Sequence, residues 1–306
     1  MSVSLHRQPA ASSSVRFTLQ GRLGNQLFTC HAAAYAHLRW QQSVELLAAP
    51  GDRVADDVAL LLGPPLRLRR VPGLTFEGEQ PATGWPARLS RALRRHRAMR
   101  TLRPHWVEGP QQRPESLLEQ PPGPWRGFTG HFQISAFTDW LHERDHRPVR
   151  LPTPRAALPA GTCAVHIRLT DYRTVPGAPL LTRSYYAQAW QALAHRSPAP
   201  VVMLFSDEPE TALPLLRSAL PAGIAERIVC APELPPVETM ALMATATSLI
   251  AANSSFSWWA GRLSTTIEAV TVPWPWFVED PMSGLYPTGW VRIPAGFGAT
   301  GACVNG

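Results

Sequence analysis

The stretch AVHIRLTDYR, residues 164–173, decides how the fold of this chain can be interpreted. Its first residues, together with Cys163, are small or apolar, which is typical of a strand covered on both faces of a parallel sheet. A histidine, an arginine, an aspartate and a tyrosine then occupy the end of that strand. Because ligands of such sheets bind outside the carboxyl ends of the strands, this end predicts a ligand site.

The same rhythm continues through the second half of the chain. Residues 147–161 have the proline density of a linker between domains, and after them strand-like runs alternate with helix-like runs. This alternation predicts a parallel sheet with crossover helices. The ends of the expected strands carry polar groups at Arg168 to Tyr172, Ser206-Asp207-Glu208, Ala231-Pro232-Glu233 and Asn253-Ser254-Ser255.

The first half begins in a similar way. VRFTLQ predicts a strand, GRLGN at residues 21–25 a turn, and the following residues a helix that runs to about Trp40. Residues 50–125 are rich in proline, glycine and arginine, and we expect them to be irregular except for a helix with seven arginines at residues 88–103. The domains are therefore expected at 1–155, an α/β domain with an irregular Arg-rich insertion, and at 156–306, a second α/β domain.

The amino-acid composition limits the class of protein to which the chain can belong. Of 306 residues, 45% are hydrophobic and 17% charged, so the chain can build a globular core. Every basic residue is arginine, which excludes a lysine nucleophile, and the formal net charge of +7 suits nucleic acid, a membrane surface or a phosphate-bearing ligand. The start of the sequence lacks the apolar core of a signal peptide, and no run has the length of a membrane span, so we expect a cytoplasmic protein.

The four cysteines at positions 30, 163, 230 and 303 have neither zinc-site nor redox spacing. We expect Cys163 and Cys230 to be buried free thiols, because both lie in apolar runs. The turn at residues 21–25 permits a close backbone approach through Gly21 and Gly24 and opens a helix whose N-terminus can receive an anion. It is neither GxGxxG nor a phosphate-binding P-loop, and the pattern alone favours an ordinary strand-to-helix turn.

Two later segments suggest phosphate chemistry. Arg168 offers a planar cation for bidentate phosphate recognition, Asp171 a base or a partner for an arginine, and His166 a group that orients either. A solvated loop salt bridge beside a core histidine is the alternative. In NSSFSWW, Ser254 or Ser255 can cap a helix whose N–H groups face a phosphate, although a plain helix cap remains possible.

Taken in order, the segments GRLGNQLF, GHFQ, HIRLTDY, FSDE and NSSFSWWAGRL resemble the α-1,2-fucosyltransferases of glycosyltransferase family 11, over residues 20 to 280. The resemblance implies an α/β fold of the GT-B-like kind, with two Rossmann-type halves facing a cleft. It also implies a guanosine diphosphate sugar donor and inversion at the anomeric carbon with neither a metal nor another cofactor. Arg22 stands where the family has its second glycine, and Leu169 and Thr170 stand where it has Arg-Gly.

The resemblance also implies roles for single residues. Arg168 would bind the pyrophosphate, the amides from Ser254 to Phe256 would complete that site, and Asp171 would be the catalytic base or only a brace for Arg168. The implied donor-binding residues are His166, Arg168, Asp207, Glu233, Asn253, Ser254, Ser255 and Phe256. The residues expected to face the cleft from the N-terminal half are Gly21, Arg22, Gly24, Asn25 and Gln26.

The expected function is transfer of L-fucose from GDP-fucose to a hydroxyl of a glycan, in an α-1,2 linkage. One alternative is a glycosyltransferase of the same fold that carries another nucleotide deoxysugar to a small natural product. Another is a non-catalytic protein that binds sugar nucleotides, or nucleic acid through residues 88–103. No groove-reading motif accompanies those arginines, so we expect no nucleic acid partner. The arginines also suit contact with the inner face of an anionic membrane. No Asp-x-Asp motif appears, so we expect no metal site.

Overall fold

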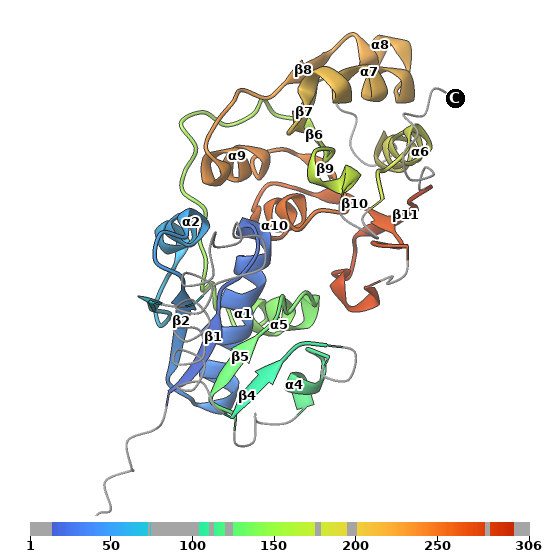
Figure 1. Cartoon of the computed structure of the whole chain (residues 1–306). Helices are drawn as coiled ribbons and strands as arrows, with labels where there is room; N and C mark the ends of the chain where they lie inside the picture. Colours follow the sequence, from blue (N-terminus) through green and yellow to red (C-terminus); the bar gives the residue numbers. More distant parts are fainter. Residues whose placement is uncertain are drawn as a thin grey trace, which may run out of the picture. The chain divides into compact units, whose positions relative to one another are not determined.

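The computed structural model of the chain describes residues 14–72, 74, 104–109, 113–119, 125–174, 179–194, 201–278 and 282–296. It divides into two compact units, Met1–Val149 and Arg150–Gly306, each with its own parallel sheet (Figure 1). The division lies within the proline-rich segment 147–161. The α/β fold class with two Rossmann-type halves is confirmed, whereas the cleft between them stays a prediction.

In the N-terminal unit the described strands form a five-stranded sheet in the order β3-β2-β1-β5-β4, with parallel pairing throughout. Its long helix packs against the strands through an almost continuous run of buried residues. The strands are β1 (Val15–Thr18), β2 (Val44–Ala48), β3 (Leu68–Arg70), β4 (His105–Val107) and β5 (Gly127–Thr129). The helices are α1 (Leu23–Trp40), α2 (Arg53–Leu61), α4 (Ser116–Glu119) and α5 (Ser135–His142).

The expectation that residues 50–125 are irregular is wrong for part of that segment, which contains α2, β3, β4 and α4. The helix α2 begins because Asp52 accepts hydrogen bonds from the backbone N–H groups of Val54 and Ala55, at 3.0 and 3.2 Å. The strand β3 contains two arginines and forms because it pairs with β2. The arginine helix predicted at residues 88–103 lies outside the described residues.

In the C-terminal unit the described strands form a six-stranded sheet in the order β11-β10-β9-β6-β7-β8, again with parallel pairing throughout. The predicted sheet with crossover helices is therefore present. Its strands are β6 (Cys163–Ile167), β7 (Val202–Ser206), β8 (Ile228–Cys230), β9 (Ser248–Ile250), β10 (Ala269–Trp274) and β11 (Val291–Pro294). Its helices are α6 (Arg183–Ala194), α7 (Pro209–Ala219), α8 (Ala222–Ala225), α9 (Pro236–Met243) and α10 (Ser255–Leu263).

The strand β6 is buried along its whole length, as its apolar sequence predicts. Its alternate residues Cys163, Val165 and Ile167 belong to the core shared with α6 and α7. His166 takes the opposite alternation, and its ring lies 5.8 Å from the ring of Phe256 on α10. Both faces of this central strand are therefore covered, which leaves its carboxyl end for polar groups.

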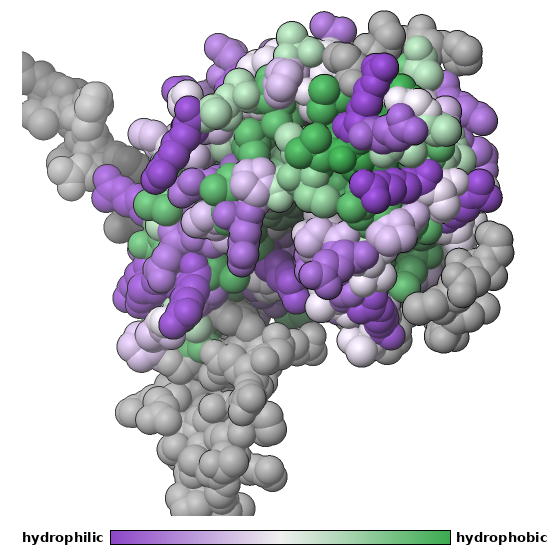
Figure 2. Space-filling view, turned by 90° about the horizontal axis from the view of Figure 1, so that it is seen from above, coloured by the Kyte–Doolittle hydropathy of each residue, from purple (hydrophilic) through white to green (hydrophobic). Residues whose placement is uncertain are grey.

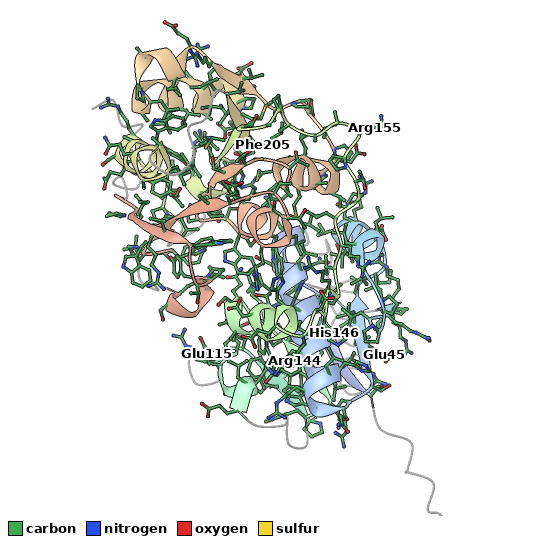
Figure 3. All side chains as sticks on the ribbon, turned by 180° about the vertical axis from the view of Figure 1, so that it is seen from behind. Glu45, Glu115, Arg144, His146, Arg155 and Phe205 are labelled. Carbon is green, nitrogen blue, oxygen red and sulfur yellow. The ribbon has the colours of Figure 1, made fainter. Side chains whose placement is uncertain are left out.

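Hydrophilic side chains are spread over the visible face in Figure 2, with hydrophobic residues between them. Figure 3 labels Phe205, buried on β7, and Glu45, which pairs with Arg16 in the N-terminal sheet. Cys163 is buried as expected, but the expectation for Cys230 is wrong, because the outermost strand β8 leaves that thiol exposed. Among the described residues, no helix combines the length and apolar character that crossing a bilayer requires.

Candidate functional site

The candidate site lies where the order of the C-terminal sheet reverses. From β6 the chain builds β7 and β8 on one side and then returns to place β9, β10 and β11 on the other. In open α/β sheets the carboxyl end of such a switch point is the usual place for a ligand. Here the carboxyl end of β6 leads into Arg168, and the end of β9 leads through Asn253 into the N-terminus of α10.

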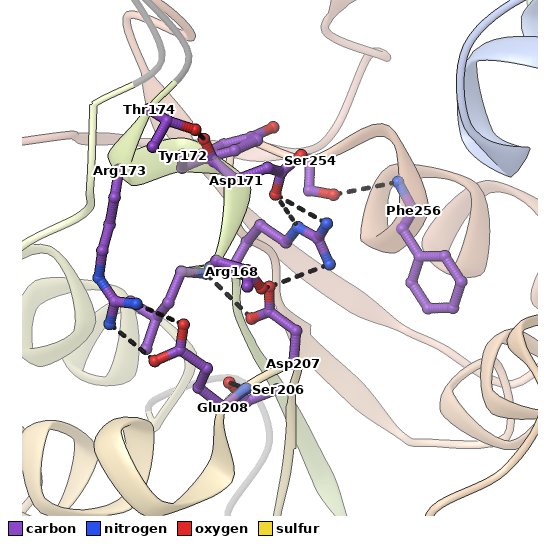
Figure 4. A network of polar contacts seen from close by, with 12 residues as sticks. Arg168, Asp171, Tyr172, Arg173, Thr174, Ser206, Asp207, Glu208, Ser254 and Phe256 are labelled. Carbon is purple, nitrogen blue, oxygen red and sulfur yellow. Dashed lines mark hydrogen bonds and ion pairs between the residues drawn. The ribbon is translucent and has the colours of Figure 1, made fainter. Parts of the chain in front are cut away.

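Arg168 is held between two carboxylates (Figure 4). Its Nε and Nη2 atoms donate to Oδ1 of Asp171 at 2.8 and 2.7 Å, and its Nη1 atom lies 3.1 Å from Oδ2 of Asp207. The guanidinium side chain is only 16% exposed, so these pairs fix its plane and direction. The predicted phosphate ligand thus stands at the sheet edge with its orientation set in advance.

Asp207 organises the loop that follows β6. Its Oδ1 accepts the backbone N–H of Leu169 at 3.0 Å, and its Oδ2 accepts both the backbone N–H of Thr170, at 3.0 Å, and the hydroxyl of Thr170. Partial burial raises the pKa of this carboxyl, but the hydrogen bonds and the charge of Arg168 outweigh that effect, so the pKa lies below its ordinary value. The Asp207 side chain, predicted to bind the donor, is thus engaged with the loop that follows β6.

The same contacts explain the departure from the family pattern at positions 169 and 170. Leu169 is 5% exposed and belongs to the hydrophobic core of the unit, where an arginine would lose its hydration. Thr170 supplies a hydroxyl that glycine lacks, and Asp207 accepts it. These two residues therefore stabilise the loop that carries Arg168.

Asp171 opens a short 3-10 turn, Asp171–Arg173, which is held from both sides. The hydroxyl of Tyr172 donates to the backbone carbonyl of Asn253 at 2.5 Å, and the guanidinium of Arg173 pairs with Glu208 through two contacts. The geometry of this state agrees with Asp171 as a brace for Arg168. Its role as a catalytic base stays a prediction.

His166 is buried, with 5% of its surface exposed, and its Nδ1 atom has no hydrogen-bond partner among the described residues. Burial, together with the charge of Arg168, lowers the pKa of the imidazole to about 3, against a smaller opposing effect of Asp207. The ring is therefore neutral near pH 7, and its centroid lies 5.8 Å from the ring centroid of Phe256 on α10.

The segment NSSFSWW forms the start of α10, as predicted. Ser254 is the N-cap residue, and its hydroxyl accepts the backbone N–H of Phe256 at 3.4 Å, while Ser255 is the first residue of the helix. Asn253 is buried, and its amide nitrogen donates to the carbonyls of Pro179 and Trp276, at 3.1 and 3.4 Å. The serines thus lie at the predicted anion-binding terminus, whereas the Asn253 amide nitrogen holds two neighbouring segments.

Glu233 follows β8, the outermost strand on its side, and is exposed. It shares the carboxyl edge of the sheet with Arg168, but β7 lies between their strands. Its role in donor binding stays a prediction.

The turn GRLGN joins β1 to α1, as predicted. Gly21 has φ +76°, and a Cβ atom there would lie 2.8 Å from Nδ2 of Asn25, so this position requires glycine. Asn25 accepts a hydrogen bond from the side chain of Gln133 at 2.8 Å, which ties the turn to the segment GHFQ. The Gln26 side chain is fully buried and donates to the Gly21 carbonyl and to Asp52, at 3.1 and 3.2 Å. Arg22 is exposed at the N-cap position of α1, and Gly24 is buried within that helix.

Sequence reasoning missed several residues whose contacts hold the loops that follow β5 and β6. Glu108 accepts the backbone N–H groups of His131 and Phe132, and it does so beside Phe132, whose φ is 52°. A single glutamate in a segment that looks irregular gives no signal of this kind. Tyr172, Arg173 and Glu208 were within the quoted segments, but only the register of β6, β7 and β9 reveals their contacts.

Among the described residues, no group of three or more histidine, cysteine, aspartate or glutamate side chains is arranged to hold a metal ion. The charge that faces an incoming anion would come from Arg168 and from the N-terminus of α10. Independence from metal ions stays a prediction.

Comparison with known proteins finds a family match in the second half of the chain. Residues 146–293 match the family described as glycosyl transferase family 11. The O-antigen biosynthesis glycosyltransferase WbnK of Escherichia coli is 29% identical over 139 residues, which are 44% of this chain and 45% of that protein. The chain therefore matches less than half the length of this curated relative.

Two of the solved structures to which this chain is similar are both of glycosyltransferases. E. coli heptosyltransferase WaaC with ADP has 13% identity and a TM-score of 0.49, covering 91% of this chain and 92% of that one. The α-1,6-fucosyltransferase NodZ soaked with GDP-fucose has 14% identity and a TM-score of 0.44, covering 82% and 93%. The family match is what confirms the resemblance read from the sequence, for residues 146–293.

Proposed function

Since residues 146–293 carry the pattern of glycosyltransferase family 11, we propose that this protein is an inverting glycosyltransferase that transfers L-fucose from GDP-fucose to a hydroxyl of a glycan, in an α-1,2 linkage. The observation that carries the proposal is the placement of Arg168. Its guanidinium stands at the switch point of a parallel sheet, next to the strand that leads into the N-terminus of α10. Both features favour a diphosphate.

The proposed reaction breaks the bond between the anomeric carbon and the diphosphate oxygen, and the electron pair leaves with GDP. The acceptor oxygen forms the new bond on the opposite face of the sugar, and its proton passes to a base, for which Asp171 is our candidate. Arg168 stabilises the charge that develops on the leaving diphosphate, together with the N–H groups at the start of α10. Electrostatic stabilisation of this kind is usually the largest contribution where no metal supplies it.

The name of the relative WbnK supports a glycan as the acceptor, because that protein is described as an O-antigen biosynthesis glycosyltransferase. A second candidate concerns the identity of the sugar donor. Leu169 replaces one of the two arginines of the family pattern and lies in the core. This observation favours, as the second candidate, the same fold carrying a different nucleotide deoxysugar.

A panel of GDP, UDP, dTDP, CDP and their sugars, measured by thermal shift, tests the donor class. A nucleotide at 100 times its dissociation constant stabilises the folded state by about 2.7 kcal/mol, which is enough to rank the panel. We expect GDP and GDP-fucose to give the largest shifts. Product formation from radiolabelled GDP-fucose then separates an enzyme from a protein that only binds sugar nucleotides. A panel in which a non-guanine nucleotide gives the largest shift would overturn the donor assignment.

A further inference from the structure

We propose that the carboxylate of Asp171 occupies the place of the donor diphosphate on Arg168, and that diphosphate binding displaces it by rotation of the Asp171 side chain. The inference rests on the proposed function and deepens it. It gives Asp171 two successive roles, first as a brace for Arg168 and then as a group released toward the acceptor.

Asp171 occupies the edge of Arg168 that is best suited to an oxyanion. Its Nε and Nη2 atoms both donate to one oxygen of Asp171, at 2.8 and 2.7 Å. This edge of a guanidinium is the one that presents two parallel N–H groups to an oxyanion such as phosphate. A diphosphate that uses this edge must take the position that Asp171 holds.

The two carboxylates around Arg168 differ in their other contacts and in their exposure. Asp207 also accepts two backbone N–H groups, from Leu169 and Thr170, and would leave these donors without their partner if it moved. The Asp207 side chain is 15% exposed, whereas the Asp171 side chain is 26% exposed. Solvent can therefore compensate the loss of the Asp171 contact more easily. Asp207 is the permanent support, and Asp171 is the exchangeable one.

The turn that carries Asp171 is anchored by its neighbouring residues. Thr170 on one side is bound to Asp207, and Tyr172 on the other is bound to the carbonyl of Asn253. Arg173 is paired with Glu208. Because the flanking residues are held, we infer that Asp171 is released by rotation of its side chain while the turn stays in place. The freed carboxylate stays at the sheet edge, where it can accept a proton, and it becomes available only after the donor has bound.

Calorimetric titration of the full chain with GDP, and separately with inorganic pyrophosphate, tests the exchange. Asp171→Asn keeps the shape of the side chain but pairs weakly with Arg168, so both ligands should bind about 5- to 10-fold more tightly than to the wild type. Glu208→Gln is the matched control, since it also removes one negative charge from this edge but faces Arg173. We expect it to change either affinity by less than about 2-fold.

Arg168→Lys in the Asp171→Asn background completes the design, because a lysine lacks the paired edge. The gain from Asp171→Asn should then disappear. Equal gains in Asp171→Asn and Glu208→Gln would contradict the exchange and leave only a general charge effect. Unchanged or weaker binding in Asp171→Asn would overturn it outright. Pyrophosphate binding that tightens in Asp171→Asn while GDP fails to bind would uphold the exchange and refute the GDP-sugar function.

Discussion

The hydroxyl group of Tyr172 donates a hydrogen bond to the backbone carbonyl of Asn253, across a distance of 2.5 Å. This bond joins the turn after β6 to the loop before α10, which are the two sides of the switch point in the C-terminal sheet. It therefore sets the position of Asp171 and Arg168 relative to the N-terminus of the helix.

Tyr172→Phe removes this bond and keeps the ring. A hydrogen bond of this kind contributes about 1 kcal/mol, so we expect a decrease of about 5-fold in kcat/KM for the transfer reaction. The melting temperature should fall by only about 2–4 °C, because about 1 kcal/mol is a small part of the stability of a chain of this size. Steady-state kinetics with GDP-fucose measure the effect. A large loss of stability with unchanged kinetics would assign Tyr172 to the core instead.

Because His166 is buried and neutral, we expect the free energy of unfolding to depend on pH. The pKa of its imidazole is about 3 in the folded state and about 6.5 in an unfolded chain, so protons favour the unfolded state as the pH falls from about 6.5 toward 3. Between pH 7 and pH 5 this coupling costs about 2 kcal/mol of unfolding free energy. The lowered pKa of Asp207 acts in the same direction at lower pH.

Urea unfolding of the wild type and of His166→Asn at pH 7 and pH 5 measures this coupling. The wild type should lose about 2 kcal/mol more than the variant between the two pH values. Parallel losses in the two proteins would show that His166 is not a buried neutral imidazole in solution.

Gly21→Ala should destabilise the N-terminal unit, for two reasons. The φ of +76° is unfavourable for any L side chain, at a cost of about 1–2 kcal/mol, and the new Cβ atom would clash with Asn25. Gly51→Ala is the matched control, because Gly51 has φ +77° and no heavy atom within 4 Å of an added Cβ. We expect Gly21→Ala to cost clearly more than Gly51→Ala in chemical unfolding. Equal costs would mean that the contact with Asn25 relaxes freely.

Transfer should proceed without a divalent metal, because Arg168 and the start of α10 supply positive potential to the diphosphate in the proposed mechanism. EDTA in excess should leave the initial rate within about 2-fold of the untreated enzyme. A rate abolished by EDTA and restored by manganese or magnesium would refute this part of the mechanism.

The sequence predicted the C-terminal unit well because burial dictates its pattern. The apolar run of β6 and the serine cap of α10 are local signals, and the alternation of strands with helices fixes the class of the sheet. It could not predict that Asp207 would bind Thr170, since that contact depends on the pairing of β6 with β7. Sequence analysis missed strand β3, because it contains two arginines and becomes a strand only by pairing with β2.

Arg168 is the proposed ligand of the donor diphosphate, and calorimetric titration with GDP tests this directly. Arg168→Lys keeps the charge but loses the planar fork, whereas Arg173→Lys makes the same change at an arginine that pairs with Glu208. We predict that Arg168→Lys binds GDP at least about 10-fold more weakly than the wild type, a difference of about 1.4 kcal/mol, and that Arg173→Lys stays within about 2-fold. GDP affinity in Arg168→Lys equal to that of the wild type would contradict the assignment of the site.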